Sequence, residues 1–148
     1  MAPRYELRAA ETGDVEFAWR LYEQLMRART EALMPWRADR QREVIEGALK
    51  SGGMQMIVAG GAACGWLHVL ERADGVELHQ IYLVPARQKL GIGTSVLRAL
   101  QARAAAAKRP LRLSVLVNNP ARRLYERLGF RIERSDPLKH YMAWRAET

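Results

Sequence analysis

A strand-to-helix turn with two glycines constrains this chain more than any other segment. Residues 84–94 read Val-Pro-Ala-Arg-Gln-Lys-Leu-Gly-Ile-Gly-Thr, after an apolar stretch and before a helical pattern. The first amides of a helix have no partner within it, and a turn without side chains at Gly91 and Gly93 lets an anion reach them. The sequence therefore predicts a phosphate-binding turn.

The glycine spacing excludes two common phosphate loops. A P-loop needs Gly-x-x-x-x-Gly-Lys-Ser/Thr, and a dinucleotide site needs Gly-x-Gly-x-x-Gly, whose last glycine is replaced here by Val96. The spacing that fits is Gln-x-x-Gly-x-Gly, from Gln88 to Gly93. The alternative is a turn whose glycines serve only tight strand-to-helix packing.

A second motif follows about 25 residues later. Residues 118–130 read Asn-Asn-Pro-Ala-Arg-Arg-Leu-Tyr-Glu-Arg-Leu-Gly-Phe. The two motifs, in this order, resemble the acetyl-coenzyme A loop and the Asn-x-x-Ala-x-x-Leu-Tyr-Glu-x-x-Gly-Phe signature of the GCN5-related N-acetyltransferase (GNAT) family. The resemblance is strong over residues 76–130, and the first half of the chain matches by pattern only.

Composition indicates an ordinary globular protein. Hydrophobic residues make up 49% and charged residues 27% of the 148 residues, and we expect residues 1–148 to form a single domain. The one cysteine, Cys64, excludes an internal disulfide and a thiol cluster for zinc, and it is expected to be a buried core thiol.

The charge and the apolar runs bear on partners. A formal net charge of +8 favours polyanionic partners, of which coenzyme A is one. The scattered arginines and the lack of a zinc-finger or RNP-like motif argue against nucleic acid. No signal segment or membrane-spanning run is visible, which predicts no membrane contact and a cytoplasmic location. The sequence does not fix the oligomeric state, and a homodimer is compatible with it.

Hydrophobic periodicity predicts a mixed α/β (α+β) fold in the order β-α-α-β-β-β-α-β-α-β-β. Expected strands are residues 4–10, 54–59, 62–70, 76–84, 111–117, 130–134 and 138–144, with a Gly60-Gly61 hairpin. Four helices are expected. The first follows Thr12 or Asp14 as its cap, the second spans residues 39–50, the third begins after Gly91, and the fourth begins after the cap Asn119. The predicted buried stripes are Val15, Ala18, Trp19, Tyr22, Leu25 and Met26; Val44, Ile45, Ala48 and Leu49; and Ile92, Val96, Leu97, Leu100 and Ala104. The resemblance implies a single-domain GNAT fold whose central strands splay apart beside the turn.

The resemblance also implies acetyl-CoA as the co-substrate, without a metal. Backbone groups of Leu83 and Val84 would pair with the pantetheine arm, and the amides of the turn would hold the pyrophosphate. Asn118 would steady the cofactor or a bound water. The cofactor-binding residues so implied are Leu83, Val84, Gln88, Lys89, Leu90, Gly91, Ile92, Gly93, Thr94, Asn118 and Tyr125.

Three residues are the catalytic candidates. Tyr125, at the tyrosine position of the family, is expected to protonate the departing thiolate, and the alternative is that it only packs its helix. Glu77 and His79 are the candidate bases. Strand alternation places both on one face with Ile81 and Leu83, and a bulge near Tyr82 would not separate them. His68 and His140 are further candidates.

The expected activity is direct transfer of the acetyl group to a primary amine in a ternary complex. The acceptor is a small-molecule or peptide amine, and Trp36 and Arg37 suit a carboxylate-bearing or aromatic amine. The alternative from another class is a catalytically silent module that senses acyl-CoA or serves as a scaffold.

Overall fold

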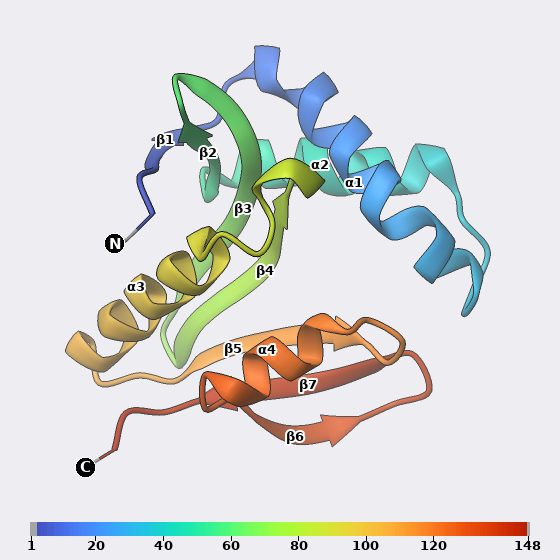
Figure 1. The fold of residues 1–148 in the computed structure, drawn as a ribbon. Helices are drawn as coiled ribbons and strands as arrows, with labels where there is room; N and C mark the ends of the chain where they lie inside the picture. Colours follow the sequence, from blue (N-terminus) through green and yellow to red (C-terminus); the bar gives the residue numbers. More distant parts are fainter. Residues whose placement is uncertain (1–2, 148) are drawn as a thin grey trace.

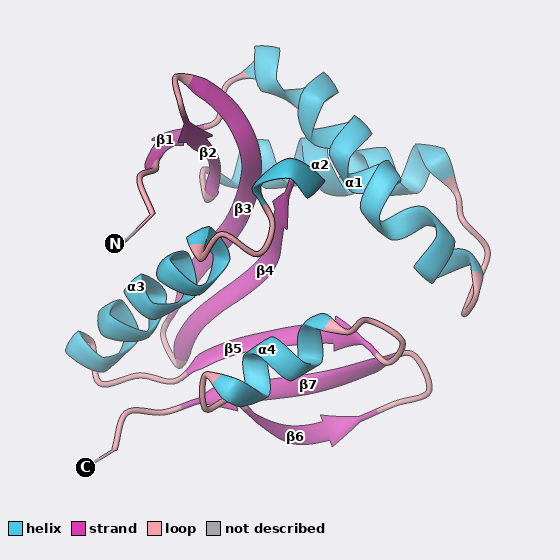
Figure 2. Cartoon of the chain, in the orientation of Figure 1, coloured by secondary structure: helices cyan, strands magenta, loops and turns pink. Residues whose placement is uncertain are grey.

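A computed structural model describes residues 3–147, which form one seven-stranded sheet with helices on both faces (Figures 1 and 2). The observed order of elements confirms the predicted one, with two short 3-10 turns, η1 and η2, in addition. In chain order the elements are β1 (Glu6–Ala9), η1 (Thr12–Asp14), α1 (Val15–Glu31), α2 (Ala38–Ser51), β2 (Met54–Ala59), β3 (Ala62–Arg72), β4 (Gly75–Leu83), η2 (Pro85–Arg87), α3 (Ile92–Ala106), β5 (Leu111–Leu116), α4 (Ala121–Arg127), β6 (Arg131–Ser135) and β7 (Lys139–Trp144).

The strands lie in the order β1-β2-β3-β4-β5-β7-β6. All neighbours are antiparallel except β4 and β5, which are parallel and are connected through α3. The predicted glycine hairpin joins β2 to β3, where Gly60 and Gly61 have φ of +62° and +80°. Two successive left-handed residues suit the twist of a tight hairpin, so this prediction is confirmed.

Two hydrophobic cores lie on opposite faces of the sheet. The core under α1 and α2 contains the buried members of the α1 stripe, and the core under α3 and α4 contains the whole α3 stripe and Cys64, as predicted. On α2, Ile45 and Ala48 are buried, but the prediction that Val44 is buried is wrong because 40% of it is exposed. Each residue turns a helix by about 100°, and Val44 lies at the margin of a narrow apolar stripe.

The start of α1 differs in detail from the prediction. Asp14 occupies the cap position of α1, but its side chain bonds backwards, accepting from the Glu11 amide at 2.8 Å. The same carboxylate receives two bonds from the Arg8 guanidinium, at 2.8 and 2.9 Å. The cap therefore ties α1 to β1.

No helix in the described part of the chain is both long and apolar enough to cross a bilayer.

Candidate active site

The sheet opens between its two central strands. β4 and β5 are paired over three positions only, Val76 with Leu111, Glu77 with Arg112 and Leu78 with Leu113. Beyond Leu78, β4 remains paired with β3 while β5 continues along β7, so the two strands separate toward the end of β4 (Figure 1). This confirms the predicted splayed central strands, and the gap is called the split below.

Leu83 presents its backbone to the split. It lies opposite Gly65 on β3, and the next amide, that of Val84, donates to the Cys64 carbonyl at 2.8 Å. In an antiparallel ladder this makes Leu83 part of a non-hydrogen-bonded pair, so its N–H and C=O point away from β3. The Val84 amide, in contrast, is occupied within the sheet.

The predicted phosphate turn ends in a row of free amides. The Ser95 amide makes the first α3 bond, to the Gly91 carbonyl at 2.9 Å. The amides of residues 89–94 have no backbone acceptor within the described chain. Such a row at a helix start, beside a strand edge that pairs with no neighbouring strand, suits a pyrophosphate followed by an extended amide-bearing arm.

The two glycines of the turn differ in what they require. Gly91 has φ of +87°, a left-handed conformation that an L residue adopts only with strain. Gly93 has no such conformation, and a Cβ there would lie 3.8 Å from Leu83 Cδ1, an ordinary contact. The backbone conformation therefore favours glycine at 91, while neither conformation nor packing within the protein requires it at 93.

A β-bulge changes the face predicted for half of β4. Val69 pairs with Leu78 and His68 with Gln80, so His79 is an extra residue in the strand. Beyond it, Ile81 and Leu83 pack in the α3 core together with Leu78, while Tyr82 packs in the α1–α2 core. The prediction that Glu77 and His79 share a face with Ile81 and Leu83 is thus wrong, and the bulge lies at His79 rather than near Tyr82.

Glu77 and His79 nevertheless lie together, in a chain of polar side chains. Glu77 Oε2 is 3.2 Å from His79 Nε2 and also binds Arg72. The His79 ring lies 5.0 Å from the His68 ring, whose Nε2 is 2.8 Å from Ser51 Oγ. Since the Ser51 hydroxyl donates to the Ala48 carbonyl at 2.6 Å, we assign the His68 proton to Nε2.

Burial and charge shift two pKa values in this chain. Burial raises the pKa of Glu77, but hydrogen bonds from Arg72 and His79 outweigh it and leave this pKa below its ordinary value. Burial, with a smaller contribution from the charge of His79, lowers the pKa of His68. At neutral pH Glu77 is therefore ionised and His68 neutral.

Tyr125 lies on the other side of the sheet, in the α3–α4 core. Its ring meets that of Phe130 edge-on at 5.8 Å, and 9% of the residue is exposed. Burial raises the pKa of Tyr125 to about 12. The hydroxyl is therefore a proton-bearing donor throughout the physiological pH range.

Asn118 and His140 lie in the C-terminal half of the sheet. Asn118 Nδ2 donates to the Arg29 carbonyl at 3.0 Å and so ties the β5–α4 loop to the end of α1. His140 contacts Ser135 Oγ at 2.7 Å and Arg122 at 3.2 Å. His140 pairs with Val115 on the α4 face, and the structure does not bring it to Glu77 and His79.

Aromatic residues from α1, β3, β4 and the segment between α1 and α2 form a cluster beside the split, and of these periodicity singled out only Tyr22. Tyr82 of β4 lies 5.4 Å from Tyr22 of α1 and 5.2 Å from Trp66 of β3, and Tyr22 lies 5.7 Å from Trp36. Burial, and then the nearby Tyr22 and Tyr125, raise the pKa of Tyr82 well above its ordinary value. No local sequence signal joins these rings, because they come from four separate segments.

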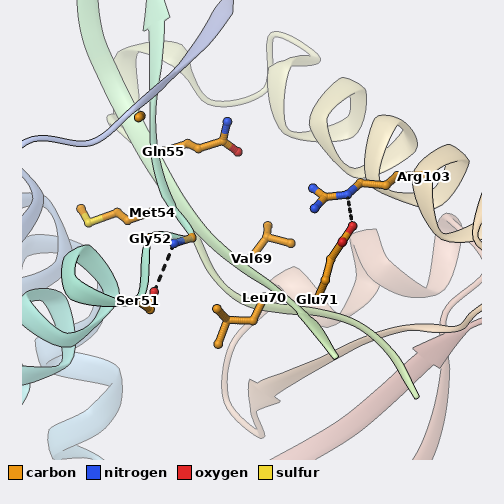
Figure 3. Close-up of a pocket in the computed structure, with 10 residues that line it drawn as sticks. Ser51, Gly52, Met54, Gln55, Val69, Leu70, Glu71 and Arg103 are labelled. Carbon is orange, nitrogen blue, oxygen red and sulfur yellow. Dashed lines mark hydrogen bonds and ion pairs between the residues drawn. The ribbon is translucent and has the colours of Figure 1, made fainter. Parts of the chain in front are cut away.

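A separate hollow of about 400 Å³ lies at the other end of the sheet (Figure 3). The Glu71–Arg103 ion pair, at 2.6 Å, and Gln55 line it from β3, α3 and β2. It meets the polar chain described above only at Ser51. The candidate site at the split is therefore distinct from this hollow.

Comparison with known proteins agrees with the fold. Residues 52–132, over half of the chain, match the family model described as an acetyltransferase (GNAT) domain. The chain therefore belongs to the GNAT acetyltransferase family. No curated protein matches it significantly.

Solved structures share the fold at low identity. A PaiA N-acetyltransferase from Thermoplasma acidophilum in complex with coenzyme A has a TM-score of 0.74 at 16% identity, with 97% of this chain and 99% of that chain covered. The ribosomal-protein-S18-alanine N-acetyltransferase of Escherichia coli has a TM-score of 0.72 at 20% identity, with coverage of 98% and 96%. An N-acetylglutamate synthase from Neisseria gonorrhoeae, complexed with coenzyme A and N-acetyl-glutamate, has a TM-score of 0.73 at 17% identity, with 100% and 36% covered.

Proposed function

We propose that this protein transfers the acetyl group of acetyl-CoA directly to a primary amine while both substrates are bound. The row of free amides at residues 89–94, next to the open edge at Leu83, is the observation that carries the proposal. The coenzyme A complexes of PaiA and of N-acetylglutamate synthase, which share the fold, support it.

The turn and the edge of β4 offer backbone groups that suit the two halves of acetyl-CoA. The amides of Lys89, Leu90, Gly91, Ile92, Gly93 and Thr94 would bind the pyrophosphate, and Gly93 leaves room that packing does not require. Leu83 would pair with the pantetheine arm as a neighbouring strand does. Bound acetyl-CoA supplies the acetyl group as an activated thioester.

The acceptor must lose a proton to attack. We assign this proton to His79, whose Nε2 lies beside Glu77 and whose Nδ1 remains to accept it. Glu77 is a weak base because its pKa is lowered, but as a carboxylate it stabilises the protonated imidazole. The new C–N bond forms as the C–S bond breaks, and the amine proton leaves through His79.

Tyr125 is the proposed partner of the departing sulfur. An ordinary thiol has a pKa of about 8.5, so full proton transfer from a phenol of pKa about 12 costs roughly 4 to 5 kcal/mol. We therefore assign Tyr125 a hydrogen bond to the developing thiolate, with the final proton coming from solvent. Such a bond to a charged group is worth about 1.5–3 kcal/mol.

Thermal unfolding with acetyl-CoA, followed by a thiol-release assay over a panel of amines, tests the proposal. At a hundred times its dissociation constant the ligand stabilises by about 2.7 kcal/mol, a rise in Tm of roughly 5 to 10 °C. Gly93→Asp should abolish the rise. Gly47→Asp is the matched control, because Gly47 lies on α2 with open space around it.

Each outcome has a distinct meaning. A rise in Tm together with thiol release supports the enzyme. A rise without release on any amine overturns the transferase and favours the acyl-CoA sensor. No rise at millimolar acetyl-CoA, or equal rises in the two variants, overturns the assignment of the turn.

A further inference from the structure

Three buried polar atoms lack a partner on the face of the sheet covered by α1 and α2. They are Gln80 Oε1 on β4, Trp66 Nε1 on β3, and Trp36 Nε1 in the segment between the two helices. Trp66 is fully buried. Leaving a buried donor or acceptor unpaired is costly, so such groups call for an explanation, and a bound ligand or water is one.

Two of these atoms, those of Gln80 and Trp66, belong to successive same-face positions of the β3–β4 ladder. Gln80 pairs with His68 and Tyr82 pairs with Trp66, so all four side chains lie on the same face. Gln80 directly follows His79, the residue to which we assign the amine proton. A group bound at Gln80 Oε1 therefore lies close to both the proton acceptor and the split.

The next same-face pair of the ladder, Trp66 with Tyr82, begins a row of aromatic rings. Rings of Trp66, Tyr82, Tyr22 and Trp36 follow one another at centroid distances of 5.2, 5.4 and 5.7 Å. Trp36, at one end of this row, and Tyr82, next to the buried Trp66 at the other, remain half-buried, so both can meet a ligand. Such faces attract a flat apolar body and, over the ring, a cation.

We propose that Gln80 Oε1 accepts a hydrogen bond from the acceptor amine, and that this amine is carried on a flat, apolar body packed along Tyr82 and Trp36. The inference rests on the proposed function and names its acceptor class. An arylalkylamine supplies both features, an N–H donor for Gln80 and a ring for the aromatic row. A polyamine or a simple alkylamine supplies only the donor.

The first test is turnover with 2-phenylethylamine, n-butylamine, putrescine and an alanyl peptide, each with acetyl-CoA. We expect kcat/KM for 2-phenylethylamine to exceed that for n-butylamine by at least tenfold. Trp36→Leu should lower kcat/KM for 2-phenylethylamine by a much larger factor than kcat/KM for n-butylamine, and so remove most of this preference. A preference for putrescine or for the peptide overturns the inference but leaves the transferase intact.

The second test isolates Gln80. Gln80→Met keeps the length of the side chain but removes the oxygen, and it should raise KM for 2-phenylethylamine about tenfold while acetyl-CoA affinity stays unchanged. Its Tm should not fall, because a desolvated oxygen has been removed. Gln55→Met is the matched control, since Gln55 pairs with Leu67 on the opposite face and lines the remote hollow of Figure 3.

Binding can be measured without turnover. Three of the four tryptophans, Trp19, Trp36 and Trp66, lie in or next to the aromatic row, so titration of 2-phenylethylamine onto the protein saturated with CoA should change the intrinsic fluorescence. Gln80→Met should weaken this binding and Gln55→Met should not. Equal dissociation constants for Gln80→Met and the native protein would overturn the role of Gln80. If acetyl-CoA instead produces no thermal shift in the native protein, the proposed function itself is overturned.

Discussion

Gln88 donates its side-chain amide to the carbonyl oxygen of Leu83 at 2.8 Å and so joins the glycine turn to the open edge of β4. This carbonyl is the group to which a pantetheine amide would donate as an added strand. In the protein without ligand, the turn therefore satisfies the acceptor that the arm of acetyl-CoA needs. We therefore expect the Gln88 side chain to compete with the arm for this carbonyl oxygen.

Gln88→Ala should affect acetyl-CoA and S-acetylpantetheine differently. Without the competing amide, affinity for S-acetylpantetheine should rise roughly two- to tenfold, since a hydrogen bond contributes about 0.5–1.5 kcal/mol. The affinity for acetyl-CoA should rise less, because the substitution also removes the Gln88 side chain from the neighbourhood of the phosphates. Isothermal titration calorimetry measures both, with the exposed Gln24→Ala on α1 as control; equal changes for the two ligands would contradict the competition.

Alanine at the two turn glycines should separate stability from binding. Gly91→Ala should lower the free energy of unfolding by about 1 to 2 kcal/mol, because φ at this position is +87°. Gly93→Ala should leave it unchanged or raise it by up to about 1 kcal/mol, since glycine is a poor helix former. Urea denaturation measures these values, and the acetyl-CoA thermal shift should shrink for Gly93→Ala; a Gly93→Ala protein that unfolds more easily but binds normally would refute the assignment.

Tyr125→Phe should lower kcat about 10- to 100-fold without lowering stability. The lost hydrogen bond to the leaving sulfur accounts for the rate, and no hydrogen bond of the hydroxyl to another described residue is lost. Because the pKa of Tyr125 is about 12, no fall in rate from its ionisation is expected between pH 8 and pH 10. Steady-state kinetics over this range test both points.

Tyr141→Phe is the matched control for Tyr125→Phe. This substitution also removes a hydroxyl. In the native protein that hydroxyl donates to Asp136 at 2.9 Å, beside the β6–β7 turn. Its kcat should remain that of the native protein. If Tyr125→Phe retains full kcat, Tyr125 only packs α4 against the sheet.

His68 should make the protein less stable as the pH falls below about 6.5. Its pKa in the folded protein lies below the ordinary 6.5, so in acid the unfolded chain binds a proton that the folded chain does not. The contribution of neutral His68 to the free energy of unfolding is complete above pH 6.5, and it is lost as the pH falls toward the pKa of His68 in the folded protein. His68→Gln, which keeps a donor for Ser51, should lose less stability between pH 7.5 and pH 5 than the native protein.

The unfolding free energy at the two pH values, from urea denaturation, provides the measurement. His140→Gln is the control, since His140 lies on β7 among Ser135 and Arg122. If native protein and His68→Gln show the same pH dependence, His68 titrates as freely in the folded protein as in the unfolded chain.

Local chemistry made much of the fold predictable from the sequence. Gly60 and Gly61 can form the hairpin, and the periodic stripes of α1 and α3 can bury one face, without reference to distant residues. Val44 shows the limit of this reasoning, because periodicity alone does not say how wide a stripe the sheet covers. The same reasoning found the turn, since φ at Gly91 follows from the local strand-to-helix geometry.

The bulge at His79 could not be predicted in this way. Its position depends on how β4 pairs with β3, where His68 faces Gln80 and Val69 faces Leu78. One extra residue reverses every later side chain of the strand, because side chains alternate with a period of two. Pairing with β3 therefore decided that Tyr82 lies on the acceptor side of the proposed site and Ile81 on the α3 side.

The sequence by itself determined the two motifs, the order of elements and the residues of the glycine turn, because each depends on neighbours along the chain. Only the tertiary structure decided that Leu83 rather than Val84 offers its amide to the split, that His68 and Ser51 join Glu77 and His79, and that Gln80 and Tyr82 meet an aromatic row from α1. These relationships arise from hydrogen-bond register and from packing between segments far apart in the chain, and no local pattern encodes them.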